Sequence, residues 1–163
     1  MANFTIQGGQ KLQGAIEIMG SKNAALALIC AAILTKEKCC IKNVPAIEDV
    51  KVLIKLLSKI GVKINWLKSD ELQIWAKNIK TTKLDPALTH RLRASILLMG
   101  ALLARQKKMQ MIHPGGCFIG QRPVGTHFEA LRELGAKITQ DQKNYYAEAK
   151  KLRGASIYLD EQS

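Results

Sequence analysis

The hydrophobic and polar positions of this 163-residue chain form a pattern that occurs twice. The first copy spans 21–64 and consists of SKNAALALICAAIL, CCIKNVP and VKVLIKLLSKIGVKI. The second spans 93–138 and consists of RASILLMGALLAR, MQMIHP and VGTHFEALRELGAKI. The two copies lie about 74 residues apart, and similarity at a fixed period is typical of stacked supersecondary units.

Each copy predicts the same elements. Its first helix is small and apolar on all sides, which predicts burial rather than an amphipathic surface position. In the second helix of the first copy, lysines lie opposite an apolar stripe. The stripe consists of Val52, Leu53, Leu56, Leu57 and Ile60. Gly61 and Gly135 follow the second helices, where glycine is the favoured C-cap, and a strand comes next. We therefore predict an α/β (α+β) fold in which each unit consists of a strand, a buried helix, a strand, an amphipathic helix and a strand.

The strand that opens the pattern is repeated at the end of the chain. KLQGAIEIMGS, at 11–21, leads into the first buried helix, and KLRGASIYLDEQS, at 151–163, is its counterpart. The chain stops where a further buried helix is expected. We therefore expect a piece of a longer protein, with an incomplete last unit.

A glycine-rich segment, HPGGCFIGQRP at 113–123, carries the candidate chemistry. Glycines on both sides of Cys117 disfavour helix and strand there, so this thiol is predicted to lie on a loop, with Arg122 five residues later. Two interpretations stay open on these residues alone. The loop carries acid–base or covalent chemistry on an anion, or it is a surface turn with a free cysteine.

Composition narrows the class of protein. The length fits one domain, and the apolar run 24–34 is shorter than the roughly 20 residues that a membrane helix needs. The start lacks the features of a signal peptide, and the four cysteines show neither a disulfide framework nor zinc-ligand spacing. We expect a cytoplasmic protein with reduced thiols, in which Cys30 is a core residue. The net charge of +12 is spread over scattered lysines without an interleaved aromatic platform, which makes nucleic-acid binding the weakest hypothesis.

With the repeat and the loop in view, the chain resembles the N-terminal part of the UDP-N-acetylglucosamine 1-carboxyvinyltransferases, a family of enolpyruvyl transferases. The resemblance covers essentially the whole chain. It rests on LQGAIEIMGSKNAAL, NVPAIEDV, LRASILLMGALLAR, PGGCFIGQRPVGTH, LGAKI and GASIYLDEQS, in the family's order. The sister family of the shikimate pathway shares the repeat but lacks the cysteine loop.

The resemblance implies a fold of repeated βαβαββ-type units with buried helices, an enolpyruvyl transferase-like inside-out α/β barrel that is truncated here. It assigns 1–21 to a strand segment of the family's other domain and 22–163 to an incomplete first domain. The implied reaction moves an enolpyruvyl group from phosphoenolpyruvate to the 3-hydroxyl of UDP-N-acetylglucosamine and releases phosphate. This is the first committed step of peptidoglycan synthesis, and it implies no cofactor and no metal.

The resemblance also implies roles for individual residues. Cys117 is the general acid that protonates phosphoenolpyruvate and the thiol that fosfomycin alkylates. Lys22 contacts phosphoenolpyruvate, Asn23 hydrogen-bonds a substrate, and Arg93 holds the nucleotide-sugar. Arg122 binds substrate phosphate bidentately. The segment that contacts the nucleotide consists of Pro123, Val124, Gly125 and Thr126. A second contacting segment consists of Glu161, Gln162 and Ser163.

Two positions depart from the family pattern. Gly125-Thr126 replaces the usual aspartate and leucine, and Glu161 stands where a lysine is common. The second half of such enzymes supplies an aspartate and further arginines, so the missing C-terminal part is the expected partner of this chain. Activity of these residues alone is not expected. The alternative function is a non-catalytic fragment that binds the nucleotide-sugar or has a structural role.

Overall fold

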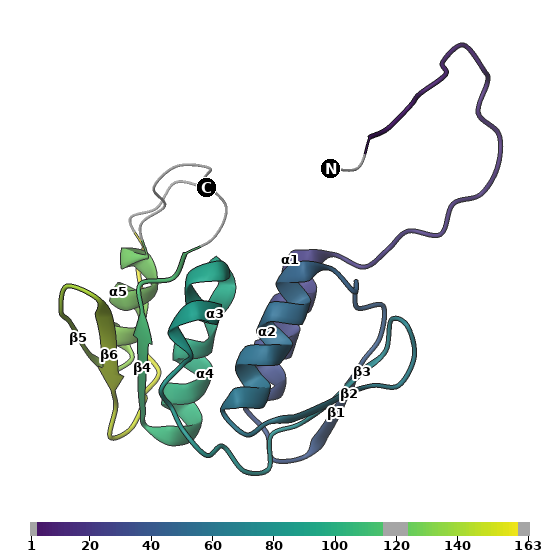
Figure 1. Ribbon diagram of the computed structural model, residues 1–163. Helices are drawn as coiled ribbons and strands as arrows, with labels where there is room; N and C mark the ends of the chain where they lie inside the picture. Colours follow the sequence, from purple (N-terminus) through teal and green to yellow (C-terminus); the bar gives the residue numbers. More distant parts are fainter. Residues whose placement is uncertain (1–2, 116–123, 160–163) are drawn as a thin grey trace.

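The structure is a computed structural model that describes residues 3–115 and 124–159. It consists of two units that share the order helix, strand, helix, strand, strand, and the second unit begins with two additional short helices (Figure 1). The first unit contains α1 (Lys22–Ala32), β1 (Lys38–Ile41), α2 (Glu48–Lys59), β2 (Lys63–Trp66) and β3 (Leu72–Trp75). The second contains α3 (Pro86–Arg91), the 3₁₀ helix η1 (Arg93–Ile96), α4 (Leu97–Gln106), β4 (Lys108–Ile112), α5 (Gly125–Glu133), β5 (Lys137–Gln140) and β6 (Asn144–Glu148). The predicted repeat of helix, strand, helix, strand is confirmed.

Each unit folds its three strands into one antiparallel sheet in which the last strand is central. The orders are β1-β3-β2 and β4-β6-β5. The register is equivalent in the two sheets. One cross-strand row reads Lys38, Trp75, Lys63 in the first sheet, and the corresponding row reads Lys108, Glu148, Lys137 in the second.

The helices lie between the two sheets, and the outer faces of the sheets meet the solvent (Figure 1). One hydrophobic cluster runs through both units, and α1 contacts both α2 and α4. Cys30 belongs to this cluster, as predicted, and burial raises the pKa of its thiol to about 12. This arrangement, with helices inside and sheets outside, agrees with the predicted inside-out α/β architecture.

The predicted glycine caps form in both units. Gly61 follows α2 with a φ of 101°, and Gly135 follows α5 with a φ of 96°. After α2, Val62 N donates to Leu57 O and Gly61 N to Ser58 O, at 3.0 Å each. After α5, the same two bonds link Ala136 to Leu131 and Gly135 to Arg132. This is the Schellman motif, which needs a left-handed residue at the glycine position.

The expectation that both apolar helices are buried on all sides is correct for α4 and wrong for α1. Five of the ten α4 residues are buried, and only Ala104 is exposed. In α1, one side packs into the core, whereas Leu28 on the other side is 52% exposed. The two helices differ because α4 is packed between α1 and the sheet of the second unit, so it is covered from two sides. Among the described residues, nothing packs against the outer side of α1.

Two further details differ from the prediction. The run 93–105 is not one helix, because Arg93–Ile96 form a 3₁₀ turn before α4, and α3 precedes it. Residues 11–20 and 151–159 contain no strand, and Leu12, Ile16 and Ile18 are each more than four-fifths exposed. A strand forms only where a neighbouring strand accepts a series of backbone hydrogen bonds. In 151–159 the bond from Arg153 N to Leu134 O, at 2.9 Å, does not extend into a ladder.

Candidate active site

The starts of α1 and α2 lie at the same edge of the molecule, the upper edge in Figure 1. Ser21 is the N-cap of α1, and its Oγ accepts a hydrogen bond from Ala24 N at 3.4 Å. The chain before it is closely packed, since a Cβ on Gly20 would lie 1.7 Å from Asn43 O. The sequence LQGAIEIMGSKN therefore needs glycine at this position, and Gly20 and Ser21 together fix where Lys22 and Asn23 begin the helix.

Two ion pairs tie the predicted site residue Lys22, and Arg91, which was not predicted as a site residue, to the first turn of α2. Lys22 Nζ lies 3.0 Å from Asp49 Oδ2, and Arg91 Nη2 lies 2.7 Å from Glu48 Oε1. All four side chains are substantially exposed, so each pair contributes at most about 1 kcal/mol to stability. The role of the two adjacent carboxylates is geometric, because they hold Lys22 and Arg91 on one shared surface.

The chain that leads to the glycine-rich segment meets this surface at the end of α3. Gly115 N donates to Thr89 O at 3.3 Å, and a Cβ on Gly115 would lie 1.7 Å from His90 O. Glycine is therefore required at the first position of GGC. The contacts run without a gap from Lys22 through α2 and Arg91 to Gly115. Arg93 begins η1 two residues after Arg91.

The remaining predicted residues fall into two groups. Val124 is the N-cap of α5, Gly125 and Thr126 are its first two residues, and Asn23 is exposed in the first turn of α1. The others lie outside the described residues: Cys117, Arg122, Pro123, Glu161, Gln162 and Ser163. The structure thus places Lys22, Arg91 and Gly115 on one continuous surface, and it gives no position for the thiol.

Sequence reasoning missed an aromatic cluster on both sides of the segment 116–123. The His113 ring stacks on Tyr145 with centroids 4.3 Å apart, and Tyr145 Oη lies 3.3 Å from His113 Nδ1. Phe128 packs edge-on against Tyr145, with centroids 4.7 Å apart. Burial raises the pKa of the Tyr145 phenol. The cluster connects α5 and β6 to the residue that follows β4. The spacing of these three residues in the sequence did not predict it.

Ser95 was also missed, although it is the repeat counterpart of Ser21. Its side chain is fully buried inside η1, and its Oγ has no hydrogen-bond partner among the described residues. Ser21, by contrast, caps its helix. Ser21 thus has a hydrogen-bond partner at the start of α1. Ser95, in the 3₁₀ turn before α4, has no side-chain hydrogen-bond partner among the described residues.

The described part of the chain offers neither a cluster of metal ligands nor a membrane-spanning helix. No group of three or more His, Cys, Asp or Glu side chains could hold a metal ion there. Within the same residues, no helix has the length and apolar character to cross a membrane.

Comparison with known proteins agrees with this geometry. The model of the family described as EPSP synthase (3-phosphoshikimate 1-carboxyvinyltransferase) matches residues 6–163. The chain belongs to this family. The predicted resemblance to enolpyruvyl transferases is therefore confirmed.

Within the EPSP synthase family, curated relatives narrow the resemblance. The chain is 44% identical over 160 residues to the UDP-N-acetylglucosamine 1-carboxyvinyltransferase of Bradyrhizobium diazoefficiens, which covers 98% of this chain and 37% of that protein. It is 42% identical over 156 residues to the enzyme of the same name from Helicobacter pylori, which covers 95% of this chain and 37% of that protein. The chain thus spans somewhat more than a third of the length of these relatives.

Solved structures of the EPSP synthase family confirm the fold. The enolpyruvyl transferase NikO from Streptomyces tendae superposes with a TM-score of 0.74 at 20% identity, over 89% of this chain and 32% of that one. EPSP synthase from Acinetobacter baumannii superposes with a TM-score of 0.67 at 20% identity, over 92% and 35%. Both likenesses show the inside-out α/β architecture, and at this identity they show the fold alone.

Proposed function

We propose that this chain forms one wall of the active site of a UDP-N-acetylglucosamine 1-carboxyvinyltransferase. The enzyme transfers an enolpyruvyl group from phosphoenolpyruvate to the 3-hydroxyl of UDP-N-acetylglucosamine and releases phosphate. Relatives with that name, at 40–44% identity over nearly the whole chain, support the choice of substrates.

One observation carries the proposal beyond similarity. The contacts from Lys22 through Asp49, Glu48 and Arg91 to the backbone at Gly115 form a continuous surface. Both substrates are anionic, and Lys22 and Arg91 are cationic side chains on this surface, with Arg93 two residues after Arg91 in the sequence. The surface reaches Gly115, which is two residues before Cys117 in the sequence. Binding of an anion next to an acidic thiol is what the reaction requires.

In this proposal three cationic residues bind the substrates and one thiol transfers a proton. Lys22 attracts the phosphate or carboxylate of phosphoenolpyruvate as a point charge, and its place in the first turn of α1 adds the favourable end of the helix dipole. Arg93 holds the nucleotide-sugar, and Arg122 binds phosphate bidentately. Cys117 donates the proton to the methylene carbon. In that role the thiol must be protonated, and neighbouring cations work against this by favouring the thiolate.

The departures from the family pattern limit how α5 contributes. Its N-cap Val124 makes no side-chain hydrogen bond, and its first turn contains no acidic residue. The backbone N–H groups of that turn therefore receive no hydrogen bond acceptor from the N-cap side chain and no carboxylate from the first turn. Gly125 and Thr126 contact the nucleotide through backbone in this proposal, since the side chains usual in the family are absent.

The remaining part of the enzyme is the proposed partner. Residues 1–21 belong to the other domain, and 22–163 form an incomplete first domain. Exposure of Phe4, Ile6, Leu12 and Ile16 supports this, because large apolar side chains are rarely left uncovered in one stretch. A second candidate function, binding of the nucleotide-sugar without turnover, is favoured by the match to only 37% of the relatives' length.

Titration calorimetry with UDP-N-acetylglucosamine tests the proposal. We expect saturable binding that weakens on the order of tenfold in Arg93→Gln, because this variant removes one charge-assisted contact. Lys22→Gln should bind the nucleotide-sugar like the parent, because the proposed ligand of Lys22 is phosphoenolpyruvate. Lys55→Gln on the exposed side of α2 and Arg153→Gln near the end of the described chain are the matched controls and should bind like the parent. Equal weakening in all four variants, or no saturable binding, contradicts the proposal. Phosphate release from phosphoenolpyruvate then separates the enzyme from the binding-only candidate.

A further inference from the structure

The outer face of the second sheet carries a groove that the proposed reaction does not use. Side chains alternate between the two faces of a strand. Met109, Met111, Tyr145 and Ala147 are buried against the helices, so their neighbours along β4 and β6 point outward. The groove lies over the first half of β4, whereas the candidate active site follows the end of that strand (Figure 1).

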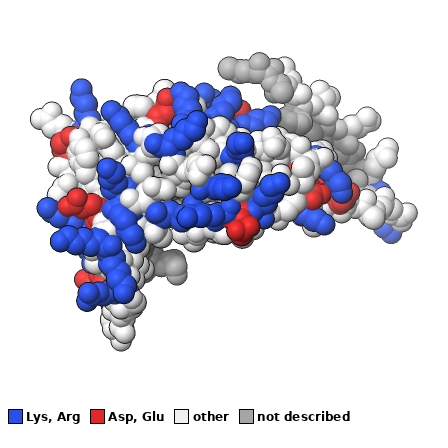
Figure 2. Space-filling model, turned by 90° about the horizontal axis from the view of Figure 1, so that it is seen from below, with Lys and Arg blue, Asp and Glu red and all other residues white. Residues whose placement is uncertain are grey.

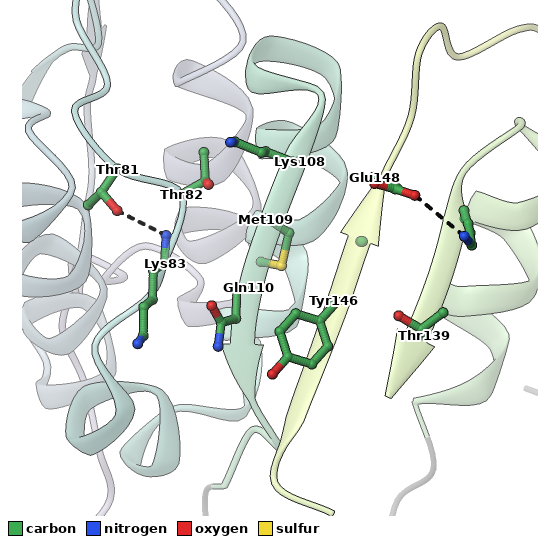
Figure 3. Close-up of a pocket in the computed structure, with 11 residues that line it drawn as sticks. Thr81, Thr82, Lys83, Lys108, Met109, Gln110, Thr139, Tyr146 and Glu148 are labelled. Atoms are coloured by element: carbon green, nitrogen blue, oxygen red, sulfur yellow. Dashed lines mark hydrogen bonds and ion pairs between the residues drawn. The ribbon is translucent and has the colours of Figure 1, made fainter. Parts of the chain in front are cut away.

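The segment before α3 forms one wall of the groove. Leu84 N donates to Gln110 O at 2.9 Å, Gln110 N donates to Thr82 O at 3.0 Å, and Lys83 pairs in parallel with Gln110. This segment therefore borders β4 on one side. On the other side β6 borders β4, and β5 lies beyond β6 (Figure 3). The cavity between them has a volume of about 370 Å³, which is within the usual range for a small-molecule site.

The charges that line the groove favour an anion. Lys83, Lys108 and Lys137 contribute three ammonium groups, and Glu148 contributes one carboxylate. Lys137 Nζ lies 3.7 Å from Glu148 Oε1, and no ion pair engages Lys83 or Lys108 within 3–115 and 124–159. The surrounding surface does not compensate this charge, since on the face seen from below blue Lys and Arg side chains are more widespread than red Asp and Glu side chains (Figure 2).

Uncharged polar groups share the same space. Thr82 and Thr139 supply hydroxyls, and the Gln110 amide lies between Lys83 and Tyr146 in Figure 3. Two of the lining side chains are already oriented. Gln110 Nε2 is 3.5 Å from Asn144 Oδ1, and Tyr146 Oη donates to Asp141 Oδ2 at 2.8 Å. The Tyr146 ring is 37% exposed and offers a flat, partly apolar surface.

We propose that this groove binds a small phosphorylated carbohydrate. The lysines attract the phosphate, and Gln110, Thr139 and Glu148 exchange hydrogen bonds with the sugar hydroxyls. The volume accommodates one sugar phosphate, and Glu148 would repel a longer polyanion such as nucleic acid. The site is separate from the surface of Lys22 and Arg93, and the proposal does not depend on the reaction.

The first sheet supplies a matched control. Its equivalent row places Trp75 where the groove has Glu148, and the ammonium groups of Lys38 and Lys63 lie 5.2 Å and 5.3 Å from the centre of the indole ring. Lys38 therefore has the same place in its sheet as Lys108, but it faces an aromatic ring instead of a mixed polar groove. Loss of Lys38 removes the same charge from the molecule without touching the proposed site.

Titration of the ¹⁵N-labelled protein with glucose 6-phosphate, followed by NMR, tests this proposal. We expect saturable shifts at the amides of Thr82, Gln110 and Thr139. The affinity should fall on the order of tenfold in Lys83→Gln and in Lys108→Gln and stay unchanged in Lys38→Gln. Glucose and inorganic phosphate, each alone, should bind more weakly than the sugar phosphate. The unperturbed spectra of the variants verify that they fold.

Four results would overturn the proposal. Shifts that remain linear with concentration, or an equal loss in Lys38→Gln, would mean that the response reflects net charge. Equal affinity for inorganic phosphate would leave no role for the carbohydrate. Shifts confined to residues around Lys22 and Arg93 would place the ligand in the proposed active site instead. That last result would leave the proposed enzymatic function intact.

Discussion

The two units have the same plan, but their apolar helices have different surroundings. Leu28 in α1 and Leu102 in α4 occupy equivalent positions of the repeat, yet Leu28 is 52% exposed and Leu102 is fully buried. The sequence pattern of the two helices is nearly the same. Similar patterns therefore give similar secondary structure, and the neighbours decide how much of each helix is covered.

The outer faces of the sheets differ in the same way. Lys38 and Lys63 flank an indole in the first unit, and Lys108 and Lys137 flank a carboxylate in the second. The backbone register is conserved between the units while the central side chain changes. The two units thus share their backbone pairing but carry different side chains on the outer faces of their sheets.

The largest expected difference between the units is at the two equivalent leucines. Leu102→Ala removes a fully buried side chain and should lower the free energy of unfolding by about 2–5 kcal/mol. Leu28→Ala should lower it by less than about 1 kcal/mol, because half of the side chain already meets solvent. Urea denaturation of both variants measures this. Equal losses would mean that α1 is covered in solution.

The contact that joins the units is the next largest effect. Arg105 donates from Nη1 to Ile33 O at 2.7 Å and to Thr35 O at 2.6 Å, and from Nη2 to Ala76 O at 3.0 Å. Arg105→Lys keeps the charge but loses the planar donor geometry, and it should cost about 1–3 kcal/mol. The matched control is Arg153→Lys, at an exposed position, where thermal unfolding should be unchanged. A change of the same size in both variants would exclude a specific role for Arg105.

The two helix caps should differ by a smaller amount. Alanine at either Gly61 or Gly135 is placed in the left-handed region, at a cost of roughly 1 kcal/mol. A Cβ on Gly61 would also lie 2.8 Å from Lys80 Cγ. A Cβ on Gly135 would lie 3.4 Å from Lys151 O, which is an ordinary contact distance. Gly61→Ala should therefore be the more destabilising change in parallel urea titrations. The reverse order would contradict the close approach at Gly61.

The smallest effect concerns the turn between β5 and β6. Hydrogen bonds from the backbone N–H groups of Lys143 and Asn144, and then from Tyr146, lower the pKa of Asp141 to about 2. A lowered carboxyl pKa stabilises the fold above the unfolded value of about 3.9, and this is lost as the pH falls toward 2. NMR titration of the Asp141 carboxyl should give its midpoint near 2. In Asp141→Ala, the contribution of this turn to the pH dependence of the free energy of unfolding between about pH 4 and pH 2 should be absent.

The parts that the sequence predicted are those set by local chemistry. The two apolar helices, the amphipathic helix with its Gly61 cap, and the strands after the glycines follow from periodicity and turn preference. The short helix α3 was missed, although Asp85 and Pro86 form a recognisable start, with Leu88 N donating to Asp85 Oδ1 at 3.0 Å. A helix of six residues has too few positions to show a period.

The parts that could not be predicted depend on long-range contacts. The pairing of Lys22 with Asp49, and of Arg91 with Glu48, joins residues that are 27 and 43 positions apart in the sequence. Periodicity carries no information about such pairs. The lack of an interleaved aromatic platform in the sequence also gave no indication of contacts between lysines and an aromatic ring in the fold. The sheet register brings Lys38, Lys63 and Lys77 within 6 Å of the Trp75 ring centre.

The central claim is that the surface of Lys22 and Arg93 serves the thiol of Cys117. The most direct test is the intact mass of the protein after exposure to fosfomycin, with and without UDP-N-acetylglucosamine, for the parent and for Cys117→Ser. The account predicts a single adduct that forms faster with the nucleotide-sugar and is absent from the variant. An adduct that survives in Cys117→Ser, or no adduct in a folded parent protein, would contradict it.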